Sequence, residues 1–179
     1  SSKITWCKSD FTRGIKKISY SSGKPDSSWG ASGTYRGSGQ CRAYYVYSME
    51  VHGNYLYATS YYGHSVFRIN LTTGVCDYSN RLRYAYNLAI GNDILHAFGR
   101  FGNRETLDLS GSKPSKINCS GYVDYDIRFS TSTAVDPSGK NFYSSRYYYI
   151  YRYTIDSNGC VNARQEANRI NFSYRDVYY

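Results

Sequence analysis

Hydrophobic and polar residues alternate along two short runs in the first half of the chain. In Tyr55–Ser60 and Val66–Leu71, aromatic and β-branched residues dominate and alternate with polar ones, which is typical of strands with one buried face. The intervening Tyr61–Ser65 contains a glycine and has the composition of a hairpin turn. The segment therefore predicts a β-hairpin.

The hairpin pattern recurs along the chain. Ile4–Gly23 matches Tyr55–Gly74 without a gap, and Ile94–Gly111 and Asn141–Gly159 match it with short gaps. A short apolar run precedes each of the later three hairpins: Met49–Val51, Leu88–Ile90 and Ala134–Val135. Four repeats in 179 residues give roughly 45 residues each, which is the period of four-stranded propeller blades.

The first repeat lacks a preceding apolar run, and the C-terminal Phe172–Tyr179 contains one. We therefore predict an all-β fold, a single four-bladed β-propeller domain over residues 1–179. Its ring would be closed by pairing of the C-terminal strand with the N-terminal hairpin, and closure would remove unpaired sheet edges.

The outer strands are predicted at the ends of the repeats. Tyr122–Phe129 has the most regular alternation in the protein and predicts the outer strand of the third repeat. Cys41–Tyr47 and Cys76–Arg83 are predicted as the outer strands of the first and second repeats. Asn162–Ala167 fits either an outer strand or a short helix.

Residues 21–40 interrupt the pattern with glycine, serine and proline, and we interpret them as an inserted loop. Long ordered loops on rigid scaffolds often carry function, so Trp29, Tyr35 and Arg36 are candidate ligand contacts. A mobile linker is the alternative. Further candidates are the aromatic residues of the hairpin turns: Tyr61, Tyr62, Phe101 and Tyr148.

The segment Leu56–Gly74, LYATSYYGHSVFRINLTTG, resembles the repeats of extracellular β-propellers of the NHL and related types. In those repeats a Leu-Tyr strand leads to an Arg-Ile-Asp-like strand that ends in Thr-Gly. Asn141–Tyr143 together with Tyr151–Tyr153 is similar to a hemopexin-type blade, from a family with four blades, although the usual Asp-Ala-Ala start is absent. The resemblance implies a fold and not an activity, because propellers host lectins, hydrolases, lyases and scaffolds.

Tyrosine content and positive charge bear on possible ligands. The 23 tyrosines fall mainly on strand-like segments, where we expect most to pack and a minority to line a binding surface. The net charge of +9, from 22 Lys and Arg against 13 Asp and Glu, favours anionic partners. Because the basic residues are scattered and form no nucleic-acid-binding motif, we do not expect nucleic acid as a partner.

The cysteines follow the repeats. Cys41, Cys76, Cys119 and Cys160 come near repeat ends, and Cys7 lies in the first predicted strand. Their spacing matches no metal-binding motif. Equivalent positions in different blades should lie farther apart than the ~7 Å that a disulfide allows, so we expect no ring of bonds among the four. We still expect at least one disulfide, and the odd number leaves a cysteine that is free, bonded to another chain or bonded to a removed segment.

Several features predict a secreted, extracellular protein. Three sequons provide glycosylation candidates at Asn70, Asn118 and Asn171. The start at Ser1, without Met or a signal peptide, suggests a processed N-terminus or a trimmed chain. No run of about 18 apolar residues is present, so we expect no membrane span. The cysteines fit an oxidising compartment.

No catalytic motif appears in the sequence. The three histidines, His52, His64 and His96, are separated, and we expect them at the surface or hydrogen-bonded. Zinc, nucleophile-elbow, phosphate-loop and paired-carboxylate motifs are missing, so we predict no catalytic residue, metal or cofactor.

Binding a ligand without catalysis requires fewer specific residues than an enzyme active site does. A concave surface with aromatic faces beside Asn, Asp, Arg and Ser would recognise sugars, so we expect a lectin-like module that binds a glycan or an anionic polysaccharide. Two alternatives stay open. One is a lyase in which a tyrosine or histidine base acts on uronic-acid polymers. The other is a structural or adhesive unit whose odd cysteine links it to another copy or another protein.

Overall fold

The structure is a computed structural model that describes residues 4–7, 14–121 and 123–169, and its strands form four antiparallel sheets in chain order. The first sheet contains β1 (Ile4–Cys7), β2 (Ile15–Ser19) and β3 (Thr34–Tyr35). The second contains β4 (Val46–His52), β5 (Tyr55–Ser60), β6 (Ser65–Asn70) and β7 (Cys76–Arg81). The third contains β8 (Ala85–Gly91), β9 (Ile94–Gly99), β10 (Arg104–Asp108) and β11 (Ser115–Ile117). The fourth contains β12 (Ser132–Val135), β13 (Asn141–Arg146), β14 (Tyr149–Ile155) and β15 (Val161–Arg169).

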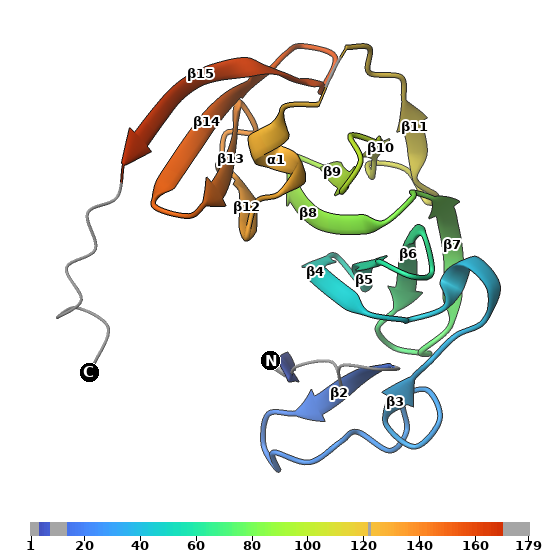
Figure 1. The fold of residues 1–179 in the computed structure, drawn as a ribbon. Coiled ribbons are helices and arrows are strands. Elements are labelled where there is room, and N and C mark those ends of the chain that lie inside the picture. Colours follow the sequence, from blue (N-terminus) through green and yellow to red (C-terminus); the bar gives the residue numbers. More distant parts are fainter. Residues whose placement is uncertain (1–3, 8–13, 122, 170–179) are drawn as a thin grey trace, which may run out of the picture.

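The four sheets stand around an open arc (Figure 1). In every sheet consecutive strands are hydrogen-bonded neighbours, so each sheet is a simple meander. Figure 1 shows β4, β8 and β12 toward the inside of the arc and β7, β11 and β15 on its outside. The predicted hairpins of the second, third and fourth repeats are confirmed as β5–β6, β9–β10 and β13–β14.

The predicted closure of a four-bladed propeller by the terminal strands is wrong. Within the described residues, β15 pairs with β14, and the first sheet contains β1, β2 and β3 alone. An open sector separates β15 from the first sheet in Figure 1. The C-terminal part of that prediction, residues 172–179, lies outside the described residues. Sequence repeats show that a sheet recurs, but closure depends on the angle between successive sheets, which no local pattern encodes.

Apolar clusters join each sheet to the next. Successive side chains of a strand point to opposite faces, so β5 contributes to two clusters. Leu56 and Ala58 share a cluster with Trp29 beside the first sheet, whereas Tyr57 shares one with Leu95 of the third sheet. The cluster between the third and fourth sheets includes Phe98, Phe142 and Tyr153. This two-sided burial explains why β5, β6 and β9 are almost entirely buried.

The inserted segment 21–40 is mostly exposed, but its Trp29 and Tyr35 belong to the apolar cluster between the first and second sheets. Trp29 is 0% exposed and Tyr35 is 7% exposed, with ring centroids 6.2 Å apart. The Trp29 indole N–H donates to the Asn70 carbonyl at 3.4 Å, and the Tyr35 hydroxyl donates to the Cys41 carbonyl at 2.7 Å. These two side chains anchor the segment, which contains β3, to the core.

Two predicted outer strands are wrong, and one alternative is resolved. Tyr122–Phe129 contains the short helix α1 (Tyr125–Arg128), and Cys41–Tyr47 contains the end of a 3-10 turn, η1 (Gly39–Cys41), before β4 begins. The outer strands of those repeats are β11 and β3, which come earlier in the chain. Asn162–Ala167 is part of β15, so the strand alternative is confirmed.

Two disulfides link neighbouring repeats. Cys41 is bonded to Cys76 and Cys119 to Cys160, with Cα atoms 6.2 and 5.6 Å apart. The expected disulfide is confirmed, but the assumption that the four cysteines occupy equivalent positions is wrong, since each bond joins two different positions in adjacent repeats. Two disulfides are typical of an oxidising, extracellular compartment. Within the described ranges, no helix has the length and apolar character that crossing a membrane requires.

A candidate ligand-binding face of tyrosine and arginine

One end of the second and third sheets gathers several chain segments. Val46 at the start of β4 pairs with Ser60, so the entry to β4 lies beside the β5–β6 turn. Ala85 at the start of β8 pairs with Gly99, so the entry to β8 lies beside the β9–β10 turn. The register thus places four loop segments at the same end of adjacent sheets.

These segments are rich in tyrosine and arginine. They form a surface that we call the aromatic–arginine face, in which the ring centroids of successive neighbours lie 4.6 to 5.6 Å apart. The face is made of Arg42, Tyr44, Tyr45, Tyr47, Tyr61, Tyr62, Arg83, Tyr84, Tyr86, Arg100 and Phe101 of these segments, together with Phe129, which follows α1. Edge-to-face and tilted contacts at these separations hold the rings in fixed orientations.

A hollow of about 210 Å³ opens in the aromatic–arginine face. It is lined by Tyr47, Tyr61, Tyr62, Tyr86, Arg100, Arg128 and Phe129. The Arg100 guanidinium donates to the Tyr61 hydroxyl at 3.0 Å, and its Cζ lies 5.6 Å from the centre of the Phe129 ring. Tyr61 is 8% exposed, whereas Tyr47 and Tyr62 are each 51% exposed. The hollow therefore has a fixed floor and accessible aromatic walls.

The backbone of the face is strained at equivalent points. Tyr45 and Tyr84 have φ of 54° and 50°, in the left-handed region that costs a tyrosine about 1–2 kcal/mol. The surrounding chain holds both in place, because the Tyr45 carbonyl accepts from the Tyr61 N–H and the Tyr84 carbonyl from the Arg100 N–H, each at 3.0 Å. Such strained residues cluster at functional sites, which makes this end of the sheets a candidate site.

Positive charge on the face is not neutralised by neighbouring acids. Arg42, Arg83 and Arg100 are exposed, and in the described part of the chain none of them has a carboxylate partner. Elsewhere, by contrast, Arg68 is held by both oxygens of Asp77 at 2.8 and 2.9 Å. The hydrogen bond that Arg100 donates to Tyr61 raises the pKa of Arg100, so the guanidinium stays charged. The face is thus suited to an anionic ligand.

Tyr47, and His64 beside Tyr84 at the edge of the face, are poorly suited to act as bases. Burial, together with the neighbouring Tyr86 and Tyr61, raises the pKa of Tyr47, so this tyrosine stays protonated. The His64 Nδ1 atom accepts a hydrogen bond from the Tyr84 N–H at 3.1 Å. These contacts fix the side chains as parts of a surface.

The structure divides the predicted ligand contacts into three groups. Tyr61, Tyr62 and Phe101 come together on the aromatic–arginine face. Trp29 and Tyr35 are buried in the core and present no face to a ligand, while Arg36 is exposed in the connection before η1. Tyr148 is 65% exposed in the β13–β14 turn, and no ring contact among the described residues joins it to the face.

Most residues of the face were not predicted as ligand contacts from the sequence. Tyr44, Tyr45, Tyr47, Tyr84, Tyr86, Arg83 and Arg100 were not singled out. A signal was present in the repeated Tyr-x-Tyr pattern at the start of an inner strand, Tyr45-Val46-Tyr47 and Tyr84-Ala85-Tyr86. His96 also differs from expectation, since it is fully buried and neither ring nitrogen has a hydrogen-bond partner among the described residues.

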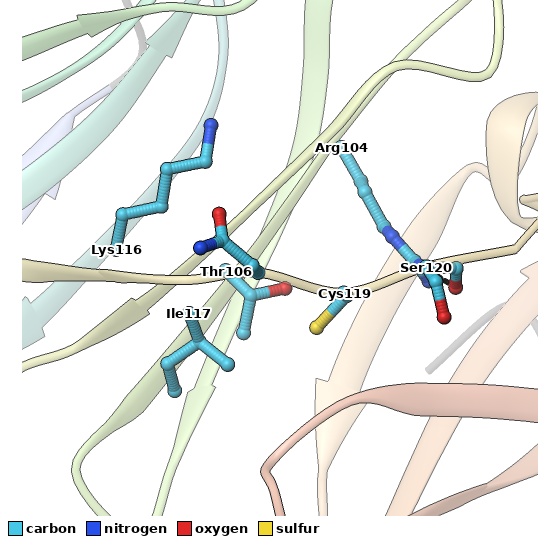
Figure 2. Close-up of a pocket in the computed structure, with 7 residues that line it drawn as sticks. Arg104, Thr106, Lys116, Ile117, Cys119 and Ser120 are labelled. Atoms are coloured by element: carbon cyan, nitrogen blue, oxygen red, sulfur yellow. Dashed lines mark hydrogen bonds between the residues drawn. The ribbon is translucent and has the colours of Figure 1, made fainter.

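A second hollow, of about 350 Å³, lies on the third sheet (Figure 2). It is lined by Arg104, Thr106, Lys116, Ile117, Asn118, Cys119 and Ser120. The Arg104 guanidinium donates to the Ser120 carbonyl. The Lys116 side chain extends away from Arg104, and its Nζ lies 3.2 Å from a carboxylate oxygen of Glu105. Both cations are therefore already engaged, which makes this hollow a weaker candidate than the aromatic–arginine face.

The glycosylation candidates also differ in their surroundings. Asn118 is exposed at the rim of the second hollow. The Asn70 side-chain oxygen accepts from the Thr72 and Thr73 N–H groups at 2.8 and 3.0 Å, so Asn70 is engaged in the turn after β6. Asn171 lies outside the described residues.

Among the described side chains, no group of three His, Cys, Asp or Glu residues is placed to hold a metal ion.

Comparisons with known proteins give no family. No family model matches the chain, and no curated protein matches it. Among solved structures, the chain is similar to Kuenenia stuttgartiensis hydrazine synthase, with 13% sequence identity and a TM-score of 0.47 over 66% of this chain and 33% of that one. The chain thus spans about a third of that protein's length, and a likeness at this level carries no argument about fold or function.

Proposed function

We propose that the protein is a secreted, non-enzymatic recognition module that binds a polysaccharide through the aromatic–arginine face. The observation that supports this function is the continuous band of rings around a hollow, with exposed faces at Tyr47 (51%), Tyr62 (51%) and Phe101 (60%). Sugars present apolar C–H faces and hydroxyls, which suit aromatic walls beside tyrosine hydroxyls and guanidinium donors.

The size of the hollow favours a polymer over a small free ligand. Small-molecule pockets enclose about 300–1,000 Å³, and this hollow of about 210 Å³ is smaller and open. One sugar ring in the hollow would leave its neighbours in a chain to lie along the flanking rings, such as Tyr44 on one side and Phe101 on the other. Several weak contacts along one chain would add up to useful affinity.

One further observation supports secretion, and another favours a binding protein over a lyase. The disulfides Cys41–Cys76 and Cys119–Cys160 fit an oxidising compartment, where extracellular polysaccharides are found. The raised pKa of Tyr47 works against this residue as a tyrosinate base, because a lyase needs the deprotonated form near neutral pH.

A glycan array followed by titration with the best ligand tests this function. We expect Tyr62→Ser and Phe101→Ser each to weaken binding about tenfold, the change that 1.4 kcal/mol produces, because each removes an exposed ring from the face. Tyr20→Ser is the matched control. Tyr20 is 68% exposed at the other end of the first sheet, beyond the Ile4–Ser19 pair, and its loss should leave affinity unchanged.

The same experiment can overturn the proposal. Failure of every glycan on the array to bind would exclude the function. Equal binding by the wild type and both face variants, or an equal loss in Tyr20→Ser, would exclude the aromatic–arginine face as the site. Melting curves of all variants separate a loss of binding from a loss of folding.

A further inference from the structure

The two halves of the aromatic–arginine face come from equivalent positions of adjacent repeats. Tyr45 and Tyr84 each precede an inner strand, each has a left-handed backbone, and the carbonyl of each accepts a hydrogen bond from the first residue of the next hairpin turn. These shared features align the two repeats residue by residue at this end of the sheets.

At two aligned positions, a tyrosine of the second sheet is replaced by an arginine in the third. Tyr44 before Tyr45 corresponds to Arg83 before Tyr84, and the turn residue Tyr61 corresponds to Arg100. Tyr62 corresponds to Phe101, so the exposed ring is kept at that position. At the two exchanged positions the face is thus aromatic on the second sheet and cationic on the third. The second-sheet half also carries one cation, Arg42, whose Cζ lies 4.8 Å from the centre of the Tyr44 ring.

The two exchanged arginines are held by rings and keep donors available. The Arg83 Cζ lies 5.5 Å from the centre of the Tyr84 ring and 5.9 Å from that of Phe101. Arg100 donates one N–H to Tyr61. A guanidinium carries five N–H donors, so each side chain retains several for a ligand. Neither has a carboxylate partner in the portion of the chain that the structure describes.

From this asymmetry we propose that the face binds an acidic polysaccharide in a defined direction. An uncharged sugar ring packs on the second-sheet half, against Tyr44, Tyr62 and the hollow, and a sulfate or carboxylate group of the chain lies at Arg83 and Arg100. Guanidinium groups bind both anions through charge-assisted, often paired hydrogen bonds. The inference rests on the proposed function and adds the ligand class and its orientation.

A repeat-matched variant tests the inference. Arg83→Tyr/Arg100→Tyr gives the third sheet the residues that the second sheet already carries at Tyr44 and Tyr61. We expect this variant to bind a sulfated or uronate oligosaccharide at least about tenfold more weakly than the wild type, and the matched desulfated or carboxyl-reduced oligosaccharide within about threefold of it. Arg83→Gln/Arg100→Gln removes the same charges with smaller side chains and replaces the tyrosine variant if that one does not fold. We expect the same loss of binding to the acidic oligosaccharide.

A charge-matched control separates a shaped site from net charge. Lys113→Gln/Lys140→Gln also removes two positive charges. Lys113 lies in the β10–β11 turn and Lys140 in the β12–β13 turn, both exposed and both at the opposite end of the sheets. We expect this variant to keep the wild-type preference for the acidic ligand. Sulfated and carboxylated ligands are titrated separately, and the tighter one identifies the anionic group.

The outcomes distinguish the inference from the function on which it rests. If the wild type binds acidic and neutral oligosaccharides equally, the inference is wrong and the proposed function stands. An equal loss in the lysine control would also overturn the inference, because net charge would then explain the preference. If the wild type binds neither ligand, the proposed function itself fails.

Discussion

Single residues at the ends of the strands carry much of the candidate site. Tyr45 and Tyr84 adopt left-handed backbone conformations at some cost, and the rings around them offset it: Tyr45 contacts Tyr44 and Tyr62, and Tyr84 contacts Tyr61 and Phe101. Each such aromatic pair contributes about 0.5–1.5 kcal/mol beyond its burial. The strained backbone and the band of rings therefore stabilise each other.

His96 makes the stability of the protein depend on pH. Burial, with a smaller effect of Arg104, lowers the pKa of His96 to about 4. In the unfolded chain its pKa is about 6.5, so the unfolded state takes up a proton first as the pH falls. The stabilisation is complete above pH 6.5 and is lost as the pH falls toward 4.

We expect the free energy of unfolding to fall by about 2 kcal/mol between pH 7.5 and pH 5 because of His96 alone. Urea unfolding at several pH values measures it. In His96→Leu this part of the pH dependence should disappear. The variant should also be at least as stable as the wild type at pH 7.5, because the substitution removes two buried nitrogens that have no partner in the described structure. An unchanged pH dependence in His96→Leu would contradict the burial of a neutral His96.

At the scale of elements, the position of the bonded cysteine relative to the outer strand alternates from one repeat to the next. In the first and third repeats the cysteine, Cys41 or Cys119, follows the outer strand. In the second and fourth repeats the cysteine, Cys76 or Cys160, lies at the start of the outer strand or directly before it. Because the positions differ, each bond reaches from one repeat's connection to the next repeat's outer strand, a pairing that uniform repeat spacing conceals.

Removal of one bond should therefore destabilise one pair of sheets. We expect Cys119→Ser/Cys160→Ser to lower the free energy of unfolding by about 2–4 kcal/mol, since a bond across 41 residues restricts the unfolded chain. Urea unfolding measures the change, and peptide mapping without reduction confirms that Cys41–Cys76 remains. An unchanged unfolding midpoint, or wild-type peptides linking Cys41 to Cys119, would contradict this account.

Local patterns predicted the hairpins well and the connections poorly. The strands β5, β6, β9 and β13 were predicted correctly, because they are rich in β-branched and aromatic residues. The expectation of one buried face is wrong for β5, β6 and β9, since both faces of these strands are buried between sheets. Residues 122–129 also alternate, but Val123 and Ile127 are four residues apart and can share one side of a helical turn, where both are buried. The Asp124 carboxylate accepts from the Asp126 N–H at 2.8 Å and caps α1. A short alternating run thus fits a strand and a capped turn equally.

At the scale of the whole molecule, four sheets are joined in chain order through three apolar clusters, and among the described residues no such cluster joins the fourth sheet to the first. The sequence predicted the all-β class and the repeated sheets, because both depend on local periodicity. It did not predict the open arc or the aromatic–arginine face. Both arise from the way adjacent sheets are placed. This placement brings the ring centroids of Tyr47 and Tyr86 to 4.6 Å from each other and lets Arg100 donate a hydrogen bond to Tyr61.

The most direct test of a polysaccharide-binding face is a crystal structure of the protein with the oligosaccharide that binds best on the array. We predict a sugar ring at the hollow, against Tyr47 or Tyr62, and an acidic group of the same chain within hydrogen-bond distance of Arg83 or Arg100. An oligosaccharide bound at the turns of the opposite end, around Asn92 and Lys140, would contradict the account. So would a saturated complex with no sugar on the aromatic–arginine face.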